Sequence, residues 1–174
     1  MNRKTRKLGL PIPWAGREGG ASECIQNLRS GATVSRDVDW EMLRRSATEV
    51  LAQAYAPYSG FSVGAAALVD DHRVVVGCNV ENVSYGLGLC AECAVVCALF
   101  GSGGGRLVAL SCVDATGQIL MPCGRCRQVL FEHGGAQLLI DHPLGPRPLG
   151  DLLPDAFGPD DLARLDRAAE QERP

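Results

Sequence analysis

The stretch VGAAALVDDHRVVVGC occupies residues 63–78 and organises the rest of the chain. Residues 63–69 are apolar at nearly every position, which is typical of a strand buried on both faces. Asp70, Asp71 and His72 form a short polar segment that predicts a tight turn. The strand pattern then returns over residues 73–78, so the stretch as a whole predicts a β-hairpin.

Upstream of the hairpin the apolar period changes to that of a helix, which Asp37 or Asp39 is suited to cap and Pro57 ends. The apolar positions that recur at spacings of three and four are Trp40, Leu43, Ala47, Val50, Leu51 and Ala54. Downstream, the pattern predicts helices over 91–100, 124–133 and 160–169, and strands over 107–113 and 137–140. This order predicts an α/β fold in which helices cover both faces of a mixed sheet.

The 174 residues suit one domain, which we place at 37–174. Residues 1–36 are rich in Gly, Pro, Ser, Arg and Lys and have no sustained period, so we expect a disordered N-terminal extension. The alternative is a basic arm that contacts an acidic partner. Glu18 and Glu23 dilute the basic character and favour the first interpretation.

Charge and composition exclude several classes of partner. The net charge of -3 and the pI of about 5.6 argue against binding to nucleic acid. The longest apolar run, residues 94–100, is too short to span a bilayer, so we expect no membrane partner. No signal peptide precedes the eight cysteines, which favours a reducing cytoplasm in which they are metal ligands or small core residues.

Two short motifs carry the chemistry. Cys90-Ala91-Glu92 is followed by Pro122-Cys123-Gly124-Arg125-Cys126. A catalytic zinc site needs three protein ligands, an open fourth position and a nearby proton carrier. The cysteine form of the nucleobase deaminase signature, C-x-E followed by P-C-x-x-C, has this composition. We therefore expect Cys90, Cys123 and Cys126 to bind Zn²⁺ and Glu92 to transfer protons.

The alternative is a closed structural zinc site. Such a site needs a fourth ligand, usually from a second C-x₂₋₄-C pair, and the chain has one such pair here. Cys93 is the candidate fourth ligand, but its place on the predicted helix suits this role poorly. An open site also leaves three thiolates against one Zn²⁺. Two predicted helix N-termini lie at Cys90 and Cys123, and they would supply positive potential and lower the thiol pKa values.

Taken together, these motifs resemble those of the small homotetrameric cytidine deaminases, over residues 39–162. The similarity rests on six segments in order. Besides the two metal motifs, they are Ala54-Tyr55-Ala56-Pro57-Tyr58-Ser59-Gly60-Phe61 with Val63-Gly64-Ala65-Ala66, Asn79-Val80-Glu81-Asn82-Val83-Ser84-Tyr85-Gly86, Cys126-Arg127-Gln128-Val129-Leu130, and Leu152-Leu153-Pro154-Asp155-Ala156-Phe157-Gly158.

The resemblance implies a three-layer α/β/α fold with a five-stranded mixed sheet and one zinc per subunit. It implies hydrolysis of cytidine or 2′-deoxycytidine to the uridine product and ammonia in pyrimidine salvage, by zinc-bound hydroxide with Glu92 as proton shuttle. It also implies a homotetramer whose subunits share active sites. By the same resemblance, Phe61 stacks near the pyrimidine, Asn79 and Glu81 bind the ribose 3′-hydroxyl, and Tyr85 and Phe157 help to close a site, in our interpretation a neighbour's.

Two alternatives to a free-nucleoside deaminase remain at this point. One is a deaminase of a nucleoside antibiotic or of a base within a polynucleotide, and the other is a structural zinc module. The chain also departs from the family pattern, since many members have arginine where Cys93 follows the glutamate. We expect Arg127 and the two helix ends to offset the thiolate charge instead, and we expect Cys78, Cys93, Cys97 and Cys112 to be small buried residues.

Overall fold

The structure is a computed structural model that describes residues 38–161, 163 and 164. The expected N-terminal extension lies outside the described residues. The predicted helix over 160–169 begins at residue 159 and is helical at 159–161, 163 and 164, and its remainder also lies outside them. The helices and strands are α2 (Trp40–Val50), η1 (Leu51–Gln53), β1 (Val63–Val69), β2 (Val74–Cys78), η2 (Tyr85–Leu87), α3 (Ala91–Gly101), β3 (Leu107–Asp114), α4 (Gly124–Gly134), β4 (Leu139–Ile140), β5 (Arg147–Pro148) and α5 (Leu149–Leu152).

A five-stranded mixed sheet in the order β2-β1-β3-β4-β5 forms the centre of the described region. The predicted hairpin is confirmed, because β1 pairs antiparallel with β2 and the register places Gly64 opposite Cys78. β1 also pairs antiparallel with β3, β3 pairs parallel with β4, and β4 pairs antiparallel with β5. Strand β1 is therefore an inner strand. Both of its faces are apolar because they enter buried clusters, Ala65 and Ala67 on one side of the sheet and Ala66 on the other.

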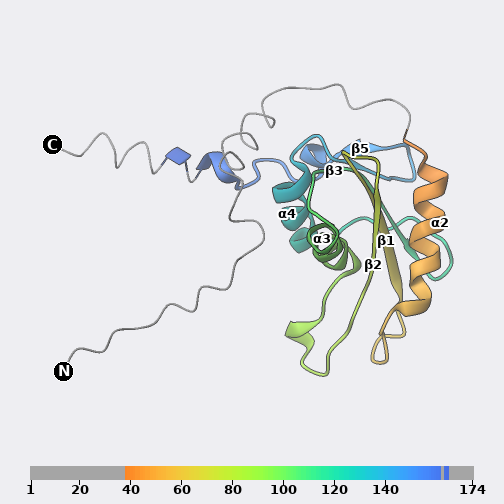
Figure 1. Cartoon of the computed structure of the whole chain (residues 1–174). Helices are drawn as coiled ribbons and strands as arrows, with labels where there is room; N and C mark the ends of the chain where they lie inside the picture. The colour runs from red at the N-terminus through yellow and green to blue at the C-terminus, as the bar shows by residue number, and fades with distance from the viewer. Residues whose placement is uncertain (1–37, 162, 165–174) are drawn as a thin grey trace, which may run out of the picture. The chain divides into compact units, whose positions relative to one another are not determined.

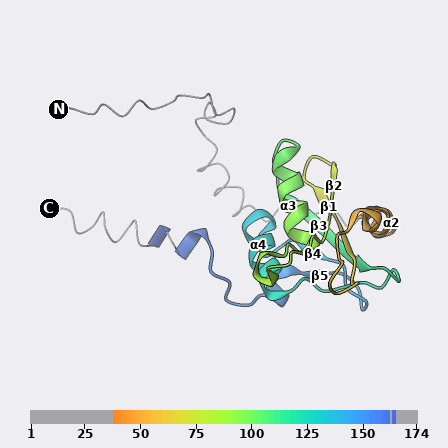
Figure 2. The ribbon, with the colours of Figure 1, turned by 90° about the horizontal axis from the view of Figure 1, so that it is seen from below.

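Helices cover the two faces of this sheet, with α2 on one side and α3 and α4 on the other (Figures 1 and 2). Asp39 caps α2 as predicted, since its carboxylate accepts from the backbone N–H of Met42 at 2.8 Å. On that side Leu43 and Ala47 pack into a buried cluster with Ala66 of β1. A larger cluster on the opposite face includes Val95 of α3 and, from α4, Leu130. The expected three-layer α/β/α architecture is thus confirmed.

Glycine allows both helices to approach the sheet closely. A Cβ at Gly77 of β2 would lie 2.5 Å from the amide nitrogen of Val95 and 2.6 Å from the carbonyl oxygen of Ala91. A Cβ at Gly64 of β1 would collide with the carbonyl oxygen of Ala47 in α2. Because these atoms belong to helix backbone, no rotation of a side chain could relieve either contact.

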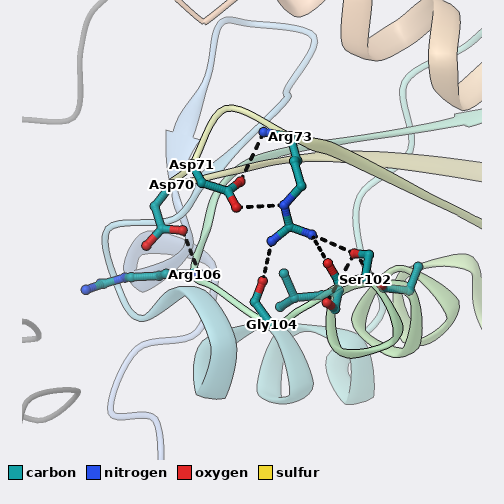
Figure 3. A network of polar contacts seen from close by, with 8 residues as sticks. Asp70, Asp71, Arg73, Ser102, Gly104 and Arg106 are labelled. Atoms are coloured by element: carbon teal, nitrogen blue, oxygen red, sulfur yellow. Dashed lines mark hydrogen bonds and ion pairs between the residues drawn. The ribbon is translucent and has the colours of Figure 1, made fainter. Parts of the chain in front are cut away.

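The hairpin turn is bonded to the C-terminal end of α3 (Figure 3). The Arg73 guanidinium donates to the backbone carbonyl of Ser102 at 2.8 Å and to that of Gly104 at 2.6 Å. Asp71 orients this guanidinium through a 2.6 Å ion pair, and Asp70 accepts from the backbone N–H of Arg106. The end of α3 remote from Cys90 is therefore fixed to the sheet.

A buried ion pair joins α2 to the segment after β4. The Asp141 side chain is fully buried and accepts from Arg44 Nε at 2.7 Å and from Nη2 at 2.8 Å. Ser111 of β3 donates a third hydrogen bond to the same carboxylate at 2.8 Å. The bond to Asp141 raises the pKa of Arg44, so the guanidinium keeps its positive charge beside the buried side chain.

Some expectations about the periphery of the domain were wrong. Strand β4 has two residues instead of the predicted four, and the residue pattern did not predict β5 or α5. Cys93 and Cys112 are buried as expected, whereas Cys78 is half-buried and Cys97 is exposed. The sequence of α3 is apolar all round, so it did not indicate that the face with Cys97 points away from the sheet. Among the described residues, helices are too short or too polar to cross a membrane.

Candidate active site

Three cysteines meet where α3 and α4 begin. Cys90 is the N-cap of α3, Cys123 is the N-cap of α4, and Cys126 lies buried in the first turn of α4. Their Sγ atoms all lie within 4.8 Å of one another, and those of Cys90 and Cys123 are 3.9 Å apart. Zinc–thiolate bonds of about 2.3 Å in a tetrahedral centre require sulfur atoms about 3.8 Å apart. The donor set and its spacing therefore fit Zn²⁺.

The thiol pKa values differ from the simple expectation for helix N-termini. Burial raises the pKa of Cys90 and of Cys126, so the expected lowering is wrong for these two residues. Burial also opposes ionisation of Cys123, but hydrogen bonds from the backbone N–H and the thiol of Cys126 leave its pKa lowered. Metal binding at this centre must therefore displace thiol protons, as is general for thiolate sites.

Glu92 lies in the first turn of α3, two residues beyond Cys90, and is 6% exposed. Among residues 38–161, 163 and 164, the group suited to a metal consists of Cys90, Cys123 and Cys126, and Cys93 is not part of it. The fourth ligand required by a closed structural site is thus missing from the described cluster. A zinc ion held by these three thiolates would keep a fourth coordination position open to a small molecule.

The guanidinium of Arg127, which was expected to offset thiolate charge, is bonded to two backbone carbonyls. Its Nε donates to the carbonyl oxygen of Pro122 at 2.8 Å, and its Nη1 donates to that of Leu152 at 2.8 Å. These bonds direct the guanidinium to backbone carbonyls on either side of α4. Arg127 therefore fixes the segment that leads into Cys123.

A cavity of about 580 Å³ opens beside the three cysteines, and Cys90, Cys123 and Glu92 line it. Its volume is in the range of small-molecule sites. Asn79 and Glu81, which the family resemblance assigns to the sugar, line the same cavity together with Cys112 from β3. Tyr85 lines it as well, although it was expected to help close a neighbour's site. Most of the cavity wall is apolar, with a few polar groups that converge from the segment over 79–82 and from Glu92.

The polar side of the cavity is held rigidly by hydrogen bonds. Asn79 Oδ1 accepts from the backbone N–H of Val63 at 2.8 Å, and Asn79 Nδ2 donates to the carbonyl of Phe61 at 2.9 Å. Glu81 accepts from the N–H of Tyr58 at 2.9 Å and from both the N–H and the hydroxyl of Ser59. The Ser59 hydroxyl and the Tyr58 N–H together lower the pKa of Glu81, which is therefore ionised at neutral pH.

The aromatic residues are divided between the cavity and the outer surface. Tyr85 borders the cavity of its own chain and meets Tyr58 edge to face, with ring centroids 6.3 Å apart. Phe61 and Phe157 are not among the residues that line this cavity, and their side chains are 51% and 61% exposed. The Phe157 carbonyl accepts from Gln128 of α4 at 2.8 Å, which ties the C-terminal segment to that helix.

Sequence reasoning missed several residues of the cavity. Tyr58 and Ser59 lie in a segment that matched the family, but no role was assigned to them. Cys112 was interpreted only as a small buried residue, and its position on the cavity wall follows from β3 pairing next to β1. Leu120 and Met121 carry no chemical signal, and they reach the cavity because they directly precede the second metal motif.

Comparison with known proteins gives a consistent result. Residues 38–140 match the family described as the cytidine and deoxycytidylate deaminase zinc-binding region. A cytidine deaminase of Mycobacterium tuberculosis is 77% identical over 128 residues, which cover 74% of this chain and 96% of that protein. A cytidine deaminase of Halalkalibacterium halodurans is 37% identical over 130 residues, covering 72% of this chain and 98% of that protein.

Solved structures agree with these sequence similarities. The crystal structure of cytidine deaminase from Mycobacterium tuberculosis superposes with a TM-score of 0.69 at 77% identity, covering 70% of this chain and 99% of that one. The crystal structure of cytidine deaminase from Mycobacterium leprae gives a TM-score of 0.68 at 55% identity, covering 68% of this chain and all of that one.

Proposed function

Because this chain belongs to the family of the cytidine and deoxycytidylate deaminase zinc-binding region, we propose that it hydrolyses cytidine and 2′-deoxycytidine to the uridine products and ammonia. The observation that carries the proposal is the position of Glu92. This carboxylate lies beside a three-cysteine cluster and inside a cavity large enough for a nucleoside. A structural zinc module would need neither the cavity nor the adjacent carboxylate.

Cys90, Cys123 and Cys126 would hold the zinc ion. When bound, zinc would act as a Lewis acid that makes a water molecule nucleophilic near neutral pH. Glu92 would take a proton from the attacking water and deliver it to N3 of the pyrimidine as the C4–O bond forms. It would then carry a second proton to the amino group, so that the C4–N bond breaks and ammonia leaves. The nearly buried position of Glu92 keeps bulk water away from these transfers.

Asn79 and Glu81 would recognise the sugar. An amide offers both donors and acceptors, while a carboxylate only accepts, so the pair suits a hydroxyl that donates to one and accepts from the other. We assign this hydroxyl to the ribose 3′ position. The ionised Glu81 would repel a phosphate on the sugar, which favours the free nucleoside over a nucleotide.

The remaining aromatic contacts are proposed to depend on assembly. Exposed apolar side chains are concentrated in the segments 55–61 and 80–89, which lie at and around the cavity. Figure 1 shows the second of these segments projecting beyond the sheet. Patches of this kind on a folded domain mark interaction surfaces. We propose a homotetramer in which Phe61 and Phe157 reach an active site across subunit boundaries, with Phe61 near the pyrimidine.

We place the reaction in the cytoplasm. The seven described cysteines are all free, including the exposed Cys97 and Cys123. Free thiols at exposed positions persist in a reducing compartment.

The test is an ultraviolet assay of the purified chain, loaded with zinc, against cytidine, 2′-deoxycytidine, cytosine and adenosine, with ammonia measured in parallel. We expect turnover of cytidine and 2′-deoxycytidine and little of cytosine, which lacks the sugar. Zinc bound at one per chain without turnover of any nucleoside would contradict the proposal and favour a structural zinc module.

A further inference from the structure

The carboxylate of Glu81 is surrounded by three donors that come from one loop. Glu81 Oε2 accepts from the backbone N–H of Tyr58 at 2.9 Å and from that of Ser59 at 3.2 Å. Its other oxygen, Oε1, accepts from the hydroxyl of Ser59. A carboxylate has about four lone-pair sites, so this arrangement leaves one position free for a further donor.

Of these three donors, only the Ser59 hydroxyl belongs to a side chain. Its Oγ also accepts from the backbone N–H of Phe61 at 3.0 Å, which fixes the direction in which the hydroxyl donates. The hydroxyl therefore links the backbone of the loop to Oε1 of Glu81 through two hydrogen bonds. Both Ser59 and Glu81 line the cavity, so the carboxylate is held in place where a substrate would meet it.

The loop does not need this hydroxyl to stay in position. The backbone N–H of Glu81 donates to the carbonyl of Tyr55 at 2.8 Å, and the N–H of Tyr55 donates to the carbonyl of Asn79 at 3.1 Å. An isolated parallel bridge joins Tyr55 to Val80. These backbone bonds hold the segments 55–61 and 79–81 together independently of Ser59. Removal of the hydroxyl should therefore free the Glu81 side chain without detaching the loop.

We propose that Ser59 is a positioning residue that presents Glu81 to a sugar hydroxyl and so determines selectivity for nucleosides that carry this hydroxyl. The inference rests on the proposed function, and it adds a residue for which the family resemblance gave no role. Without the Ser59 hydroxyl, both remaining donors bind Oε2, and the Glu81 carboxylate can turn about that oxygen. Part of the substrate's binding energy would then be lost in ordering the carboxylate. The lowered pKa of Glu81 agrees with this arrangement.

The experiment measures kcat and KM of zinc-loaded variants with cytidine and with 3′-deoxycytidine, which lacks the hydroxyl assigned to Glu81. Ser59→Ala should raise KM for cytidine about tenfold, the size expected for weakening one charge-assisted hydrogen bond, with kcat little changed. It should leave KM for 3′-deoxycytidine unchanged. Ser59→Thr keeps the hydroxyl and should restore the wild-type KM, since residue 59 is exposed and has room for a methyl group.

Ser84→Ala is the matched control. Ser84 is also a serine in a segment beside the cavity, and its side chain makes no capping hydrogen bond to η2. This variant should have wild-type constants. An equal loss by Ser59→Ala on both substrates would show a merely structural role and overturn the inference. Wild-type enzyme that treats both substrates alike would also overturn it, while the deaminase activity would stand. A wild-type chain inactive on cytidine would contradict the proposed function itself.

Discussion

The Sγ atoms of Cys90 and Cys123 lie 3.9 Å apart although 33 positions separate the two residues in the sequence. Each is the N-cap of its helix, so the starts of α3 and α4 converge on one point. This convergence follows from the packing of both helices on the same face of the sheet. It places two partial positive charges beside a cluster of thiolates, where they offset part of the negative charge.

Replacement of one member of the cluster should remove the metal. Cys90→Ala leaves two sulfur ligands, which cannot hold zinc as three do, so we expect loss of bound zinc and of turnover. Cys97→Ala is the matched control, because Cys97 lies on the same helix but is exposed. It should retain both properties. Metal analysis after dialysis, combined with the cytidine assay, measures both, and zinc retained at one per chain in Cys90→Ala would contradict the assigned ligand set.

Gly77 should be more important for catalysis than Gly64, although alanine is expected to destabilise the fold at both positions by about 1–3 kcal/mol. A methyl group at Gly77 presses on the backbone of α3 at Ala91, next to Glu92, whereas one at Gly64 presses on α2, which carries no residue of the site. We therefore expect Gly77→Ala to lower kcat or zinc affinity in folded protein. Gly64→Ala should change stability alone.

Urea unfolding gives the stability of each glycine variant, and kinetics on the folded fraction give its activity. Equal kinetic losses in the two variants would show that displacement of α3 has no special effect on the site.

The ion pair between Arg44 and Asp141 should contribute to stability because one partner is fully buried. Arg44→Gln leaves the Asp141 carboxylate buried with Ser111 as its remaining side-chain donor. We expect a loss of about 2–3 kcal/mol, less than for a fully buried pair because the guanidinium is partly exposed. The exposed neighbour Arg45 offers the control, and Arg45→Gln should change stability by less than about 0.5 kcal/mol. Urea unfolding at one fixed protein concentration gives the free energy of unfolding of both variants. Equal losses would contradict a stabilising role for the ion pair between Arg44 and Asp141.

The charge at position 93 should control zinc binding. Cys93 is buried in the first turn of α3, at the position where the family resemblance leads us to expect arginine. Cys93→Arg should keep zinc and turnover, because its positive charge offsets that of the thiolates. Cys93→Glu adds a fourth negative charge at the same place and should weaken zinc binding. Competition with a chelator ranks the zinc affinities of the two variants. Tighter zinc binding by Cys93→Glu than by Cys93→Arg would show that the charge at position 93 does not control zinc affinity.

The hairpin and the start of α2 could be predicted from sequence because their signals are local. Residues 63–78 contain two apolar runs and a polar turn, and Asp39 stands directly before a helical period. Strand β5 could not be predicted in this way, because it has two residues, one of them Pro148, and exists only through pairing with β4. Such pairing depends on the tertiary fold and leaves no periodic pattern.

The clustering of Cys90, Cys123 and Cys126 was predictable for a different reason, since their spacing in the sequence matches a known zinc motif. The positions of Phe61 and Phe157 were not, because whether an aromatic side chain enters a cavity depends on the arrangement of distant segments. Ser59 and Cys112 carry no motif of their own, and their places beside the cavity follow only from the fold.

The most direct test of a catalytic zinc centre measures metal content and cytidine turnover together in wild-type protein and in Glu92→Gln. The substitution keeps the shape of the side chain and removes its ability to carry a proton. We predict one zinc per chain in both proteins and a fall in kcat of at least about a hundredfold in the variant. Undiminished turnover in Glu92→Gln, or loss of its zinc, would contradict the role of Glu92 as a proton carrier outside the ligand set.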